Sequence, residues 1–234
     1  MIEKTASYRP IGSMTAMYGE GMAIAERMGL LETLRRHSYR QEWQVLFHTD
    51  GRKLRTFNLQ RAHALQGGTL TLKRSDWLRV LYQAVNRHVP VQFNTTIRTL
   101  QETTQGVDVT LSDETAAPYD LVAGADGIHS AVRRLVFGAG HRRPIGLGVM
   151  TFLLEDVGDL LARAQLTPFT VHEWFAPGRY VEVTALAEDV VAGIFVYPSL
   201  PGHMVPPPSE RQAVLRAQFA AVYGGVHTVI DAVP

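Results

Sequence analysis

The stretch of sequence that decides the fold reads Asp120-Leu-Val-Ala-Gly-Ala-Asp126-Gly127-Ile-His-Ser130-Ala-Val-Arg133. Its apolar first half predicts a strand, and Gly127 permits a tight turn into a helix. Ser130 is a typical helix cap, because its hydroxyl can accept a hydrogen bond from a backbone N–H of the first turn. A carboxylate at the carboxyl end of a strand, beside a helix N-terminus, marks the place where open α/β sheets bind dinucleotides. The alternative is a well-formed strand-to-helix junction that binds nothing.

Composition narrows the classes of function. The 234 residues suffice for one large domain or two small ones, and 46% hydrophobic residues can form a core. A formal net charge of +1 gives no electrostatic reason to expect nucleic acid or an anionic membrane as a partner. The sequence has no cysteine and its nine histidines lack ligand spacing, so we expect no metal site. Because no apolar run resembles a signal peptide or a membrane span, we expect a soluble cytoplasmic protein.

The opening stretch resembles the fingerprint D-G-x-x-S-x-x-R of the FAD-dependent aromatic hydroxylases, the flavoprotein monooxygenases of the para-hydroxybenzoate hydroxylase type. Asp126, Gly127, Ser130 and Arg133 match every fixed position. Residues 19–31 read G-x-G-x-x-x-A-E-R-M-G-L-L, which is similar to the subgroup that includes the tetracycline-inactivating monooxygenases. The resemblance implies FAD as cofactor, NADPH or NADH as reductant, and a small aromatic or polycyclic substrate. It implies that Asp126 binds FAD and that Gly127 allows the backbone to approach it.

The N-terminal residues carry a second part of this resemblance. Ile2-Glu3-Lys4 reads as the end of a strand and is followed by Arg9-Pro10-Ile11-Gly12, as in the family's second dinucleotide-domain strand and its R-P-x-G loop. A carboxylate at that strand end can accept hydrogen bonds from ribose hydroxyls, so Glu3 is the candidate, with Lys4 and Gly12 beside it. The alternative is an ordinary charged residue near a terminus.

Arg74 begins a third matching motif. The family has R-x-x-L-x-x-x-L at a helix start, and its arginine contacts the flavin cofactor; here Trp77 and Leu81 follow Arg74 at that spacing. An arginine at a helix N-terminus opposes the helix dipole, which suggests an anionic partner, although a surface arginine is the simpler alternative. No catalytic residue is assigned, because the cofactor carries the chemistry in such enzymes.

The expected fold is α/β, with an incomplete FAD-binding, Rossmann-like dinucleotide domain over residues 1–140 and a mixed β-sheet substrate domain over 141–234. A hairpin at 43–58, turning at an Asp-Gly pair, should contribute to the substrate sheet. Strand-like runs follow at 147–154, 170–175, 179–186 and 190–198, and a helix is expected from 209 with Ser209 as its cap. The aromatic residues of these strands either line the substrate cavity or belong to the core; they are Phe152, Trp174, Phe195 and Tyr197.

Two motifs of the family are missing from this sequence. A G-x-G-x-x-G turn should lie roughly 20 residues before the ribose-binding acid, and a G-D-A-x-H motif should follow the substrate sheet. We therefore expect a chain truncated at both ends, poorly soluble or oligomeric, that retains no flavin unless a complementing chain or a second copy is present. The alternative to an FAD-dependent monooxygenase is a non-enzymatic remnant, or a module that pairs with another flavoprotein.

Overall fold

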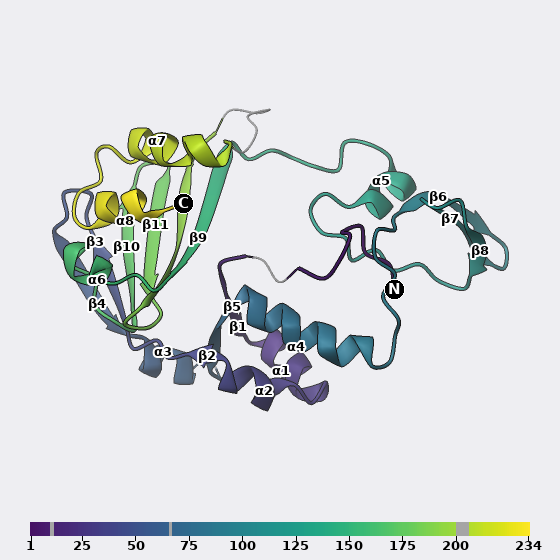
Figure 1. Ribbon diagram of the computed structural model, residues 1–234, viewed down its shortest axis with the longest axis horizontal. Helices are drawn as coiled ribbons and strands as arrows, with labels where there is room; N and C mark the ends of the chain where they lie inside the picture. The colour runs from purple at the N-terminus through teal and green to yellow at the C-terminus, as the bar shows by residue number, and fades with distance from the viewer. Residues whose placement is uncertain (10–11, 66, 200–205) are drawn as a thin grey trace. The chain divides into compact units, whose positions relative to one another are not determined.

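The computed structural model describes residues 1–9, 12–65, 67–199 and 206–234, which form a mixed α/β structure (Figure 1). Two compact units contain residues 1–9 with 82–145, and residues 10–81 with 146–234. Their boundary falls within one helix, α4 (Arg74–Asn86). These units reflect how the residues pack, whereas the predicted domain boundary at residue 140 separates two functions. That boundary therefore stays a prediction.

The first unit is built around an antiparallel meander. Its strands are β6 (Ile97–Thr103), β7 (Gly106–Leu111) and β8 (Ala116–Tyr119), paired in chain order, and α5 (Ala131–Phe137) follows them. The N-terminal segment joins this unit through a parallel bridge between Ile2 and Gln92.

The second unit contains two sheets. The smaller has the strand order β1-β5-β2, from β1 (Met14–Tyr18), β2 (Ser38–Tyr39) and β5 (Thr69–Lys73), and it packs with α1 (Glu20–Arg27) and α2 (Leu31–Arg36). The larger has six strands in the order β4-β3-β10-β11-β12-β9. These strands are β3 (Trp43–Phe47), β4 (Lys53–Asn58), β9 (Leu147–Glu155), β10 (Thr170–Ala176), β11 (Arg179–Ala185) and β12 (Val190–Pro198). The 43–58 hairpin therefore joins the large sheet, as predicted, with β3 parallel to β10.

One face of the six-stranded sheet forms the main core. Three helices cover it, α6 (Leu160–Arg163), α7 (Pro208–Gln218) and α8 (Val226–Ala232) (Figure 1). The four aromatic residues expected either to line the substrate cavity or to belong to the core all lie in this core. They are Phe152, Trp174, Phe195 and Tyr197, and each is at most 7% exposed. Because side chains alternate along a strand, the opposite face carries their neighbours. We call that opposite side the open face.

Described residues cover the open face near one end. There Met14 and Tyr39 pack against a small cluster that includes Val190 and Ala192. Farther along the same face, Val149 on β9 and Phe175 on β10 are more than half exposed. The sheet thus presents apolar side chains to the solvent on the side away from its helices.

Two predicted elements differ in the structure. The strand expected from Asp120 is absent, because β8 ends at Tyr119 and residues 121–127 form no strand. A strand exists only beside a hydrogen-bonded partner strand, and no described strand pairs with these residues. The helix expected from Ser209 begins at Pro208, with Pro207 as its N-cap. Proline has a fixed φ suited to the first helical position, so the Pro-Pro pair overrides the serine as the start signal.

The helix α4 begins directly after β5, and the Asp76 carboxylate accepts a hydrogen bond from Arg79, 2.5 Å away. α1 and α2 are separated at Gly29, which has a φ of 70°. Within the described ranges, no helix has the length and apolar character needed to cross a membrane.

Candidate functional site

The Asp126 carboxylate holds the start of α5. Oδ1 accepts a hydrogen bond from the Ser130 hydroxyl at 2.5 Å, and Oδ2 accepts from the backbone N–H groups of Ala131 and Val132 at 2.5 and 3.1 Å. The first-turn N–H groups of a helix have no partner inside the helix, so these bonds fix the helix start to the loop. The carboxylate predicted to bind a ligand thus also has a structural role within its own loop.

Ser130 and Arg133 complete the loop. The Ser130 hydroxyl accepts from the Arg133 backbone N–H at 2.9 Å, which confirms the predicted cap. The Arg133 guanidinium donates to the carbonyl oxygens of Gly127 and Ile128 at 3.4 and 2.5 Å. Each fixed position of the D-G-x-x-S-x-x-R fingerprint is therefore explained by a bond or backbone angle within residues 126–133, which we call the Asp-Gly loop.

The surroundings of the loop leave room for a ligand. Gly127 has a φ of 76°, in the left-handed region that favours glycine, and a Cβ there would meet no described atom within 4 Å. Burial raises the pKa of Asp126, but hydrogen bonds from Ser130 and the backbone outweigh it and leave the pKa below its usual value. The loop is thus exposed, ionised and preorganised, which fits a polar cofactor that approaches the backbone.

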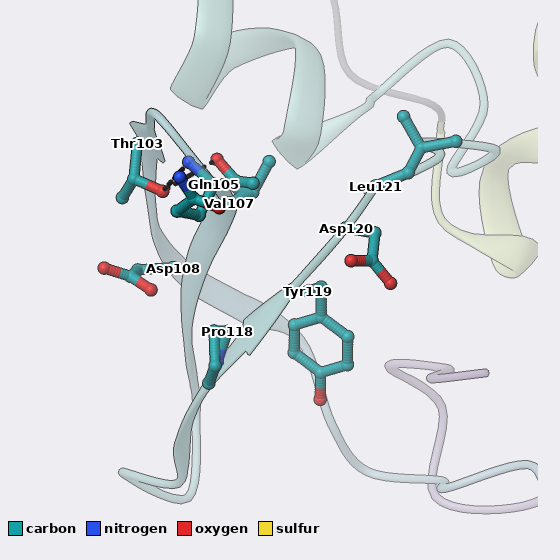
Figure 2. A pocket seen from close by; sticks show the side chains of 9 residues that line it. Thr103, Gln105, Val107, Asp108, Pro118, Tyr119, Asp120 and Leu121 are labelled. Carbon is teal, nitrogen blue, oxygen red and sulfur yellow. Dashed lines mark hydrogen bonds between the residues drawn. The ribbon is translucent and has the colours of Figure 1, made fainter.

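The chain leading into this loop borders a shallow cavity of about 530 Å³ (Figure 2). Its walls come from β7, β8 and the turns beside them, and Tyr119, Asp120 and Leu121 form one side. Leu121 is 80% exposed. None of the residues predicted to bind FAD lines this cavity, so the fingerprint residues and the cavity are separate features.

Glu3 is held by the backbone of the first unit. Its N–H donates to the Gln92 carbonyl and its own carbonyl accepts from Thr95 N–H, at 2.9 and 3.0 Å. One carboxylate oxygen accepts from the backbone N–H of Thr5 at 2.8 Å, and the side chain is half-buried. Lys4 is exposed. The second carboxylate oxygen of Glu3 has no hydrogen bond recorded among the described residues.

Gly12 and Arg74 lie together in the second unit. A Cβ on Gly12, whose φ is 121°, would come within 2.6 Å of the Arg74 Cδ, and the Arg74 backbone N–H donates to the Ser13 carbonyl at 2.9 Å. Pro10 and Ile11 of the R-P-x-G motif lie outside the described residues. A cavity of about 500 Å³ begins at Gly12 and continues along β9 to Arg211 on α7. The structure therefore brings Gly12 and Arg74 together, while Glu3, Lys4, Asp126 and Gly127 belong to the other unit.

A polar cluster on the open face was not among the residues predicted from the sequence. Tyr180 places its hydroxyl between the carboxylates of Glu173 and Glu182, at 2.6 and 2.8 Å. The sequence contains a signal for this cluster, because a β-hairpin that turns at Pro177-Gly178 places Glu173 directly opposite Glu182. Among the described residues, no group of three or more His, Asp and Glu side chains could hold a metal ion.

A family model described as "FAD binding domain" matches residues 1–174. The chain belongs to this FAD-binding family. The predicted family is thus confirmed by a match that covers three of the sites above, namely the Asp-Gly loop, the N-terminal strand end and the Gly12–Arg74 pair.

Individual relatives and solved structures agree with this assignment. A flavin-dependent monooxygenase of Legionella longbeachae is 30% identical over 158 residues, which cover 67% of this chain and 40% of the relative. An uncharacterized protein of Mycobacterium tuberculosis is 36% identical over 140 residues, 59% of this chain and 38% of the relative. The chain thus spans about 40% of the length of the curated relatives it matches.

Solved structures with similar folds include the following two. Klebsiella pneumoniae HpxO complexed with FAD and uric acid has a TM-score of 0.79 at 20% identity, covering 99% of this chain and 58% of that one. The tetracycline destructase Tet(55) has a TM-score of 0.73 at 19% identity, covering 98% and 58%. At these identities the likeness establishes the fold alone.

The capping role of Asp126 leads to a first prediction. Replacing Asp126 with alanine removes three hydrogen bonds to the loop and should destabilise the start of α5 locally by about 1 kcal/mol. Hydrogen exchange of the Ala131 and Val132 amides should become faster. Asp120→Ala, which removes an exposed aspartate six residues earlier, is the control and should leave these amides unchanged. Equal protection of the two amides in wild type and Asp126→Ala would contradict the capping role.

Proposed function

We propose that this chain supplies the Asp-Gly loop and the substrate-facing sheet of an FAD-dependent monooxygenase. The observation that carries the proposal is the loop, in which all four fingerprint residues have a defined place and the backbone at Gly127 is left open. The family match supports FAD as the cofactor. The relatives named as flavin-dependent monooxygenases support the class of reaction.

We infer two groups of cofactor contacts, one in each unit. Glu3, with one free carboxylate oxygen, would accept hydrogen bonds from ribose hydroxyls, and Lys4 follows it on the surface. In the second unit, the exposed Arg74 would bind the cofactor's anionic part beside Gly12. Bound FAD supplies the redox chemistry, taking electrons from NADPH or NADH and activating dioxygen.

The open face of the six-stranded sheet is the proposed substrate side. Its exposed apolar side chains, such as Phe175 and Val149, suit a small aromatic or polycyclic ring, and they exclude water from it. Uric acid in the complex of the Klebsiella protein is a heterocyclic compound of this size. The sheet would thereby orient the ring, while oxygen transfer depends on the cofactor.

Substitution of Gly127 tests the cofactor site directly. Gly127→Val places a branched side chain where FAD would approach and should weaken FAD binding at least about tenfold, or roughly 1.4 kcal/mol. The binding constant can be followed by FAD fluorescence in an equilibrium titration, since we expect the chain to lose FAD during gel filtration.

Gly140→Val is the matched control for this substitution. Gly140 lies in the same unit, also has a positive φ with no described atom near a Cβ, and is outside the Asp-Gly loop. It therefore reproduces the backbone strain without touching the proposed cofactor site. If both variants bound FAD equally well, the loop would not be a cofactor contact. A wild-type chain with no FAD binding at any concentration would favour the non-enzymatic alternative.

A further inference from the structure

The polar cluster on the open face has one hydroxyl proton for two carboxylates. The Tyr180 oxygen lies 2.6 Å from Glu173 Oε1 and 2.8 Å from Glu182 Oε2, and both distances are those of hydrogen bonds. A phenol hydroxyl carries a single proton and can donate to only one of these oxygens. If both glutamates were ionised, the second contact would place two oxygen lone pairs against each other.

We propose that Glu182 is protonated at near-neutral pH and that Glu173, Tyr180 and Glu182 form one hydrogen-bonded chain. In this chain the Glu182 carboxylic acid donates to the Tyr180 oxygen, and Tyr180 donates to the Glu173 carboxylate. The cluster then carries one negative charge in place of two. This inference goes beyond the proposed function and concerns residues other than the proposed cofactor contacts.

The remaining contacts decide which glutamate carries the proton. Glu173 is 8% exposed, and its other oxygen, Oε2, accepts a hydrogen bond from the Gln44 amide at 2.6 Å. Glu173 thus receives a donor at each oxygen, as an ionised carboxylate requires. Glu182 also has one further donor among the described residues, the Thr184 hydroxyl, but its distance to Oε1 is longer, at 3.1 Å. The shorter contact from Gln44 stabilises an ionised Glu173 more strongly, so the proton is placed on Glu182 Oε2, which donates it to the Tyr180 oxygen.

The electrostatic surroundings agree with this placement. Burial, together with the negative charge of Glu173, raises the pKa of Glu182 above its usual value, although hydrogen bonds from Tyr180 and Thr184 oppose the rise. Burial and the two glutamates likewise raise the pKa of Tyr180, so its hydroxyl stays protonated.

No described cation neutralises the pair. Along the same row of the sheet, β12 places Ile194 beside Glu182, with Thr151 of β9 beyond it, and β3 places Leu46 beside Glu173. The nearest basic residue in that row is Arg55 on β4, beyond Leu46, and its guanidinium lies over the Phe57 ring. A proton is therefore the charge that the described cluster can acquire.

The shared proton has a consequence for ligands of the open face. One negative charge in place of two weakens the repulsion of an electron-rich or anionic ring on this surface. If the proton is lost at alkaline pH, both carboxylates become ionised and the second Tyr180 contact turns repulsive. The cluster would then separate, and the sheet surface around Tyr180 would change with it.

Infrared spectroscopy of the 234-residue chain tests the proposal without FAD, so its failure is distinct from failure of the proposed function. Between pH about 6 and 7 ordinary glutamates are ionised, so a carbonyl band of an un-ionised carboxylic acid identifies a shifted group. We expect wild type to show this band and Glu182→Gln to lack it. Glutamine has the shape of the neutral acid, so this variant should still fold.

Two further variants sharpen the assignment. Glu173→Gln removes the neighbouring charge, and the acid band of Glu182 should then disappear at a lower pH than in wild type. Glu188→Gln replaces an exposed glutamate and should retain the wild-type band. A wild-type spectrum with no acid band above pH about 5.5 would overturn the proposal without any variant. A band that persists in Glu182→Gln would place the proton elsewhere and overturn it as well.

Discussion

Replacing Gly225 with alanine should deprive the second unit of its stable fold. A Cβ at this position would lie 1.8 Å from the Ala164 carbonyl oxygen and 2.7 Å from its carbonyl carbon. These are backbone atoms at the end of α6, and Ala164 is only 2% exposed, so they cannot swing aside as a flexible side chain can. α6 and α8 would have to separate, with a cost above the roughly 3 kcal/mol typical of overpacked cores.

Urea unfolding followed by circular dichroism measures this effect, and Gly21→Ala is the matched control. Gly21 lies in the first turn of α1, where the nearest described atom to a Cβ would be the Met17 Cγ at 3.2 Å, a side-chain atom that needs to move by only a few tenths of an ångström. Alanine favours helix more than glycine, so this control should be neutral or slightly stabilising. An unfolding midpoint in Gly225→Ala equal to that of wild type would show that α6 and α8 are not packed as closely as the structure has them.

Acidification should destabilise the same unit through His172. This side chain is 1% exposed; its Nε2 accepts the Thr167 backbone N–H at 3.1 Å, which leaves Nδ1 to donate to the Val183 carbonyl at 3.3 Å. The Nε2 contact requires the neutral ring, because a protonated Nε2 has no lone pair with which to accept. Burial lowers the pKa of His172 to about 4, from an ordinary value of 6.5.

The sign of the pH effect follows from this difference. The unfolded chain binds the His172 proton below pH about 6.5, whereas the folded chain resists it until about 4, so stability is complete above 6.5 and is lost as the pH falls between these values. The loss amounts to about 3 kcal/mol in the free energy of unfolding.

Unfolding free energies of wild type and His172→Gln, measured from pH about 7.5 down to 4, separate this group from others. Glutamine can keep one donor and one acceptor but does not titrate, so its stability should depend less on pH over this range. His88→Gln, at an exposed histidine, should keep the wild-type dependence. Parallel curves for wild type and His172→Gln would rule out His172 as the cause.

The local motifs were predictable because their bonds join neighbours in sequence. Within the Asp-Gly loop, Asp126, Ser130 and Arg133 contact partners no more than six residues away. The 43–58 hairpin and the meander likewise depend on turns and alternation that a short window contains. The family could be inferred for the same reason, since its fingerprints are local.

Features that depend on distant partners could not be predicted in this way. The stretch from Asp120 has the composition of a strand, yet without a paired neighbour it does not form one. Ser209 was a good cap by type, but the two prolines before it set the helix start. Likewise, Phe152, Trp174, Phe195 and Tyr197 could face either side of the sheet until the helices that cover one side were known.

The sequence by itself determined the family, the Asp-Gly loop and the positions of most strands along the chain, because each depends on residue types at short spacing. Only the tertiary structure decided which face of the large sheet is core and which is open, and that Glu173, Tyr180 and Glu182 meet on the open one. The physical reason is that the alternation of side chains along a strand defines two faces of the sheet but does not determine which of them is buried. Burial is assigned only when the helices, which lie far away in sequence, pack against one of them.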